Sequence, residues 1–391
     1  MEKLISDVII PPTADILVLL KYCYLLTLFI YIPFLGMTYG GSILSVFFYF
    51  SGKFGLEAKT FILGVSSKSS HHSTKEDDEA NIEVAREIML KLFPEKHLGL
   101  FLGAFPLITI AFVNLQNLYS ADIYVSSMFI KAIIFSFLGY HFIYKWKTSL
   151  VDEHFYNMVE SKTKACDYDL NEQLHERKIK AESMNGLSSL LGPIFLTFSI
   201  VYLVAALNII LEPSKWASIH NLYEATFIWG FWAQLGYFAM TTVAFTSVGI
   251  LKFVCNSDST MSDLAFTQVK SFASNIGFWT VLFLPVMGAI YLNVLPKAAY
   301  TSKIVCYSGT SLLFFLIIAY RLYYLVGTSD RRSGSCSAFS LMVIAFCFVS
   351  LSGNAARIQA TQSFVDTIVI HSSSTHHAPV SQSVTNHTKH H

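Results

Sequence analysis

The sequence predicts an all-α protein, a polytopic integral membrane helix bundle with about eight transmembrane helices. Hydrophobic residues make up 53% of the 391 residues and charged residues only 14%, whereas soluble domains carry about 25% charged residues. The mean hydropathy is +0.50. The apolar residues gather in runs of about 20 residues or more, which is the length of helix that crosses a bilayer core.

The apolar runs give the expected spans in chain order. Only helices and closed barrels satisfy the backbone hydrogen bonds in lipid, and no run alternates polar and apolar residues as a barrel strand does. The first and fifth runs are longer than a bilayer requires and predict helices that tilt or project. The runs are Ile16 to Phe50, Leu98 to Leu118, Ile123 to Trp146, Leu187 to Leu211, Leu222 to Leu251, Phe272 to Leu295, Lys303 to Val326 and Ala338 to Ile358.

Polar segments divide the chain into a transmembrane domain at residues 1–358 and a tail at 359–391. Two polar loops, 51–97 and 147–186, fall on the same side of the membrane. Ala80 to Phe93 has helical periodicity and predicts an amphipathic helix on the membrane surface. The tail is rich in His and Ser, and we expect it to be external and disordered.

The distribution of charged residues predicts the orientation of the protein in the membrane, whereas the net charge does not indicate a binding partner. The net charge of +1, from 27 basic and 26 acidic residues, gives no field that would favour nucleic acid. Most Lys and Arg residues near the spans lie on the side of the two polar loops, which the positive-inside rule places in the cytoplasm. The sequence therefore predicts a protein of an inner or equivalent energy-coupling membrane, with both termini on the outer or periplasmic face.

Several site classes lack sequence support. The six cysteines are scattered singly, without C-x-x-C or C-x-x-C-H, so no zinc site, thioredoxin motif or covalent haem attachment is expected. G-x-S-x-G, H-E-x-x-H and P-loop motifs are absent from the sequence as well, which argues against hydrolases and NTPases. We assign no metal ligands.

Two histidines are the candidate cofactor-binding residues, because histidine is the usual axial ligand of haem b within membranes. His97 begins the second span, and His141 lies near the same end of the third. A hairpin that turns near residue 120 places the two imidazoles at similar depth. Gly99, Gly103 and Gly139 would give a macrocycle or a quinone ring room beside them. The alternative is that His97 is interfacial and that His141 belongs to an aromatic belt.

Lys131 is the candidate catalytic residue, for charge compensation or proton movement. It lies inside the third span, where an ionisable group costs a few kcal/mol and normally faces a partner or a water path. Asp122, Glu212 and Glu224 are the expected partners, and outward snorkelling of the lysine is the alternative.

Three segments carry a resemblance to a known family. They are Ile30 to Phe50 (IYIPFLGMTYGGSILSVFFYF), Leu98 to Tyr119 (LGLFLGAFPLITIAFVNLQNLY) and Ala355 to Phe364 (AARIQATQSF). The chain resembles eight-span bacterial membrane proteins distantly related to the large subunit of cytochrome bd-type quinol oxidases. The resemblance implies membership of a membrane electron-transfer assembly that contacts quinone and an external cytochrome. The sequence lacks the G-R-Q-P-W motif and the first-span ligand histidine of true oxidases, so no catalytic residue is transferred from them.

Three functions remain open from the sequence. The first is an integral subunit of a respiratory quinol or cytochrome complex, at most an oxidoreductase subunit, with His97 and His141 binding haem b or quinone. The second is a solute transporter with a midplane site near Lys131 and Asn114. The third is a cofactor-free scaffold that packs against other membrane subunits.

Overall fold

The computed structural model describes residues 14–54, 75–117, 125–163, 168–219, 221–255, 261–326 and 335–376. Within these ranges the elements are helices, and no strand is present. Eight of the described helices are long and apolar enough to cross a membrane. The prediction of an all-α polytopic membrane bundle is therefore confirmed.

The elements combine long helices with short turns of 3-10 helix (η1, η3) and π-helix (η2). In chain order they are α2 (Ala14–Phe54), α4 (Lys75–Leu92), α5 (Lys96–Asn117), α6 (Val125–Thr163), α7 (Tyr168–Leu211), η1 (Pro213–Ser218), α8 (Leu222–Thr226), α9 (Trp229–Gly249), η2 (Ile250–Val254), α10 (Asp263–Val294), η3 (Lys297–Ala299), α11 (Ser302–Val326) and α12 (Ser335–His376).

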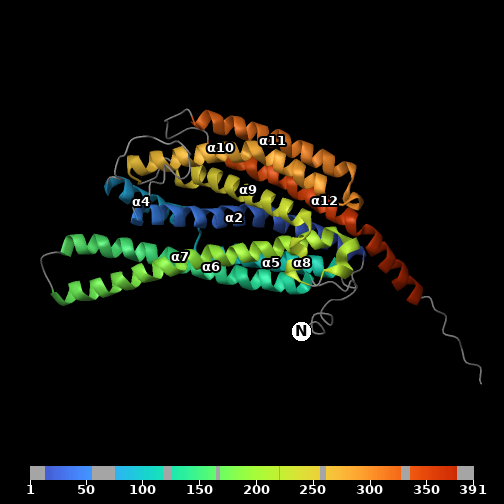
Figure 1. The fold of residues 1–391 in the computed structure, drawn as a ribbon, viewed down its shortest axis with the longest axis horizontal. Coiled ribbons are helices and arrows are strands. Elements are labelled where there is room, and N and C mark those ends of the chain that lie inside the picture. Colours follow the sequence, from blue (N-terminus) through green and yellow to red (C-terminus); the bar gives the residue numbers. More distant parts are fainter. Residues whose placement is uncertain are drawn as a thin grey trace, which may run out of the picture.

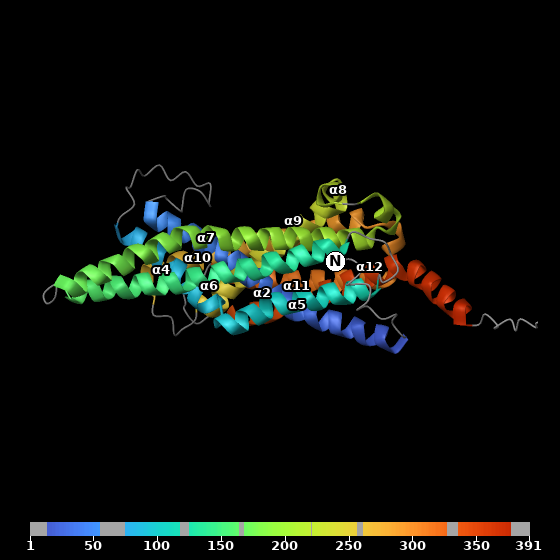
Figure 2. The same cartoon turned by 90° about the horizontal axis from the view of Figure 1, so that it is seen from below.

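The long helices lie side by side along one axis (Figures 1 and 2). α5, α6 and α7 form one layer, α10, α11 and α12 form another, and α2 and α9 join the two. α2 packs against both α5 and α9, so the first helix is central to the bundle. Pro33, Pro106, Pro193 and Pro285 all lie inside continuous helices, as the apolar runs predict.

The fifth apolar run is broken into two helices. α8 ends at Thr226 and α9 starts at Trp229, with extended backbone at Ile228 (φ −79°, ψ 119°). The side chain of Asn221 caps α8, and Trp232 Nε1 donates to the Thr226 carbonyl across the break at 2.8 Å. Leu222 to Leu251 has enough apolar residues to predict one run despite Glu224, so hydropathy alone did not show the break.

α4 packs into the bundle, which differs from the expected helix on the membrane surface. Val84, Ala85 and Ile88 are fully buried, and α4 contacts α2, α6, α10 and η2. The Ser45 hydroxyl of α2 donates to the Ala85 carbonyl at 2.7 Å. Gly41 of α2 allows the approach, because a Cβ there would already lie 3.0 Å from Leu92. The apolar face of α4 is therefore covered by protein.

α6 and α7 continue past the other helices as an antiparallel pair (Figure 1). At 1.5 Å per residue the 39 residues of α6 extend about 58 Å, whereas a bilayer core is about 30 Å thick. We call residues 147–163 of α6 and 168–186 of α7 the stalk. Its base still contacts the bundle, where Tyr49 of α2 donates a hydrogen bond to Glu153 at 3.4 Å. Glu153 also joins the two helices of the stalk by accepting a hydrogen bond from Asn185.

At the opposite end, α12 continues from the bundle to His376. The tail predicted at residues 359–391 therefore begins as helix. Residues 377–391 lie outside the described part of the chain, so the prediction of disorder is not tested there.

Candidate functional site

The two candidate cofactor ligands lie on exposed surfaces of adjacent helices. His97 is the second residue of α5, and His141 lies in α6. Both side chains are exposed, and the described contact of His141 is an edge-on one with Phe142, with ring centroids 5.6 Å apart. Neither imidazole lies in the interior of the bundle.

Protein side chains fill the space beside the glycines that were expected to leave room for a cofactor. A Cβ at Gly99 would lie within 3.0 Å of the Tyr144 ring, and one at Gly103 would lie equally close to the Tyr140 ring. A Cβ at Gly139 would lie 2.7 Å from Leu196. The missing side chains of these glycines therefore make room for two tyrosines and a leucine of the neighbouring helices.

The register of α5 and α6 also fixes the direction of His97. Gly99 faces Tyr144 and Gly103 faces Tyr140, close to the pairing that a turn near residue 120 predicts. Residues two apart in a helix lie about 200° apart around its axis, so His97 lies on the side of α5 away from α6. By the same pairing His97 lies level with Trp146 of α6, five residues or about 7.5 Å along the helix from His141, and the two imidazoles do not face one another across this helix pair. Their role as ligands stays a prediction.

Lys131 lies beside an aromatic ring between α6 and α7. Its Nζ is 5.6 Å from the centroid of the Tyr202 ring, a distance typical of a cation–π contact. Of the expected partners, Glu212 pairs with Lys215 at 2.5 Å and Glu224 accepts a hydrogen bond from Asn221 at 2.8 Å. Asp122 lies outside the described residues.

Sequence reasoning missed a buried cation, Arg357 of α12. Its side chain is only 7% exposed, within a helix that spans the membrane. The guanidinium donates to Asn114 Oδ1 of α5 and, at 2.9 Å, to Asn354 Oδ1. Its Cζ lies 3.8 Å from the centroid of the Tyr24 ring in α2. Arg357 therefore joins three helices through neutral partners.

The sequence contains a partial signal for this cluster. Arg357 stands one residue before the end of the eighth apolar run, where a basic residue normally reaches the headgroups. Asn354 precedes it by three residues, which places both side chains on one helix face. Asn114 and Tyr24 come from distant parts of the chain, so only the fold reveals that the guanidinium is enclosed.

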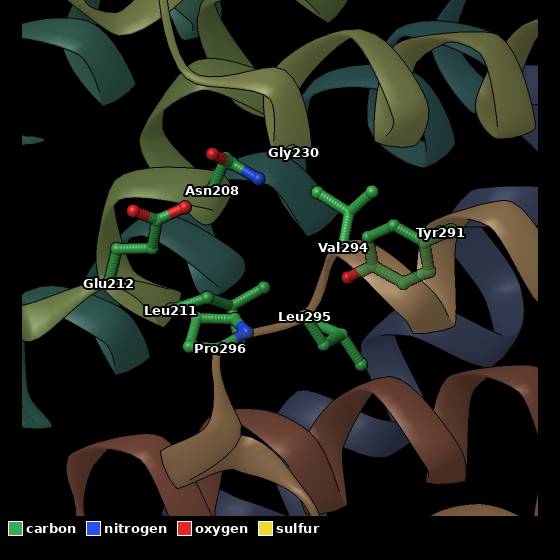
Figure 3. Close-up of a pocket in the computed structure, with 8 residues that line it drawn as sticks. All are labelled: Asn208, Leu211, Glu212, Gly230, Tyr291, Val294, Leu295 and Pro296. Atoms are coloured by element: carbon green, nitrogen blue, oxygen red, sulfur yellow. The ribbon is translucent and has the colours of Figure 1, made fainter.

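A shallow hollow lies near the same end of the bundle, between α7, α9 and α10 (Figure 3). Asn208, Glu212 and Tyr291 present polar atoms around it, among apolar neighbours such as Leu211 and Pro296. Asn208 Oδ1 is buried and has no hydrogen-bond partner among the described residues. The hollow is too narrow to admit a water molecule, so it does not provide room for a haem, a quinone or a solute.

The described residues give little support for a metal-binding site or for a reactive thiol. No group of three His, Cys, Asp or Glu side chains there lies close enough to hold a metal ion. Cys255, just after η2, is buried, and burial raises the pKa of its thiol to about 12. At neutral pH that thiol is protonated and therefore a poor nucleophile.

Comparisons with protein-family models, curated proteins and solved structures found no match. The resemblance to relatives of the cytochrome bd large subunit therefore gains no support from them.

Proposed function

We propose that the chain is a cofactor-free scaffold subunit that packs against other subunits of a larger membrane complex. The observation that carries this proposal is the apolar surface of the stalk. Val151, Phe155 and Met158 are 42%, 53% and 43% exposed. Their spacing of four and three residues places them on one face of α6. This face points away from the side on which Glu153 meets Asn185 of α7.

The stripe lies past the apolar run that ends at Trp146, and the exposed polar residues Asp152 and His154 stand between its members. We therefore infer that it faces water rather than lipid. Contiguous apolar patches on water-exposed surfaces mark interaction sites, and a stripe at this spacing suits packing against another helix. The bundle interior supports the same function, because Gly99, Gly103 and Gly139 contact protein side chains and the hollow in Figure 3 is too narrow for a ligand.

Membrane type and orientation belong to the same proposal. The positive-inside distribution of Lys and Arg supports a cytoplasmic stalk and outer termini, in an inner or equivalent membrane. The partners would then include a cytoplasmic helix of a neighbouring membrane subunit.

Position-specific photo-crosslinking tests the scaffold function. A photoreactive amino acid replaces Phe155 or, as the control, exposed Asn157, which lies about 200° away around α6. Irradiation of native membranes should give a discrete product of fixed mass from position 155 and little from position 157. Equal or absent crosslinking at both positions would contradict the proposal.

One observation favours a second function, electron transfer. The exposed imidazoles of His97 and His141 are available to a haem b or quinone shared with a partner subunit. In that case the external cytochrome or quinol complex is the partner, and the visible spectrum distinguishes the two functions.

A further inference from the structure

The buried guanidinium of Arg357 has no carboxylate partner among the described residues. Its partners are the carbonyl oxygens of Asn114 and Asn354 and the ring face of Tyr24. These groups satisfy hydrogen bonds but carry no net charge. Arginine cannot lose its proton in a protein, so a full positive charge remains within the bundle. Such a charge is costly within a membrane protein unless it serves a function or binds an opposite charge.

The chemistry around Arg357 suits an oxyanion. A guanidinium presents five N–H donors in a planar fork that matches carboxylate and phosphate oxygens. Asn354 lies one turn before Arg357 on the same helix, and its amide holds both an acceptor and two donors. If that amide turns, its carbonyl leaves the guanidinium and its NH₂ group donates to the same anion.

The cluster lies close to the end of α5. Asn114 lies three residues before Asn117, the last residue of α5, which is a rise of about 5 Å along the helix. The only described carboxylate near this end that is largely buried, Glu212, is paired with Lys215. The cluster therefore holds an uncompensated cation about one turn from the end of α5.

We propose that Arg357, with Asn114, Asn354 and Tyr24, forms a binding site for an oxyanion, either a carboxylate or a phosphate group. The same chemistry is offered by a soluble anion and by the phosphate of an anionic lipid. This site is independent of the stalk, and its failure would leave the scaffold function untouched.

Thermal unfolding of the full-length protein in a neutral detergent tests the site. The titrants are sodium phosphate and sodium acetate, with sodium chloride at matched ionic strength, and separately phosphatidylglycerol against phosphatidylcholine. We expect a saturable rise of a few degrees in Tm, because a ligand that binds only the folded state stabilises it. A response to soluble phosphate or acetate identifies a soluble anion, and a response to phosphatidylglycerol alone identifies the lipid headgroup.

Two variants assign the response to Arg357. Arg357→Gln should abolish the saturable rise, whereas Arg321→Gln, at an exposed arginine of α11, should retain it. Asn354→Asp places a carboxylate beside the guanidinium, so it should fold and also lose the response, even if Arg357→Gln does not fold. A wild-type Tm that does not respond to any of these anions beyond chloride would overturn the proposal. An unchanged response in Asn354→Asp would overturn it as well.

Discussion

The ring of Tyr140 lies directly against Gly103, closer than any side chain at that position would permit. Tyr140 is fully buried, and its hydroxyl lies 3.0 Å from Thr38 Oγ1 of α2. One tyrosine therefore joins α6 to both α5 and α2. A planar cofactor at this crossing would have to displace it.

Replacement of Gly103 by Ala tests this contact. The added methyl group should force Tyr140 to move and destabilise the protein by about 1–3 kcal/mol, the usual cost of overpacking. Gly309→Ala is the control, because a Cβ there meets nothing within 4 Å. Thermal unfolding in detergent measures both. Equal stability of the two variants would show that Tyr140 does not fill the crossing.

The burial of α4 predicts different costs on its two faces. Ile88→Ala should lower the free energy of unfolding by about 2–5 kcal/mol, because Ile88 is fully buried. Leu90→Ala is the matched control, since Leu90 is 37% exposed and its loss should cost far less. Similar small losses at both positions would place α4 outside the bundle.

Lys131 and Tyr202 should be energetically coupled. A cation–π contact contributes about 0.5–2 kcal/mol, depending on its exposure to solvent. The double-mutant cycle of Lys131→Met and Tyr202→Leu isolates this coupling from the packing of Tyr202 against Phe135, whose ring centroids are 5.7 Å apart. Additive losses of stability would show that the lysine is not held by the ring.

Cysteine labelling tests the proposed orientation. In a background without native cysteines, Ser218→Cys in η1 should react with a membrane-impermeant maleimide in intact cells. Asn157→Cys in the stalk should react only after permeabilisation. Both positions are exposed, so burial does not decide the result. The opposite pattern would reverse the membrane orientation.

The spans could be predicted from sequence because composition alone decides them. An apolar run of about 20 residues needs no distant partner to be a transmembrane helix. The break between Thr226 and Trp229 could not be predicted from sequence, because it depends on backbone geometry and on the capping of α8 by Asn221. The burial of α4 was also hidden, since an amphipathic face fits either a membrane surface or a protein groove.

The candidate site was only partly predictable for a related reason. Hairpin length gives only an approximate depth for His97 and His141, because both the exact register and the side of each helix that faces its neighbour depend on packing. Arg357 shows the same limit. Its position near the end of an apolar run predicts a residue that reaches the headgroups, and only contacts with Asn114 and Tyr24 enclose it.

The reduced-minus-oxidised visible spectrum of the protein, purified from native membranes with its partners, tests the scaffold function most directly. Parallel spectra of His97→Ala and His141→Ala assign any band to these residues. We predict no b-type haem band that either substitution removes. A b-type band in the wild-type preparation that disappears in either variant would contradict the scaffold function and establish electron transfer.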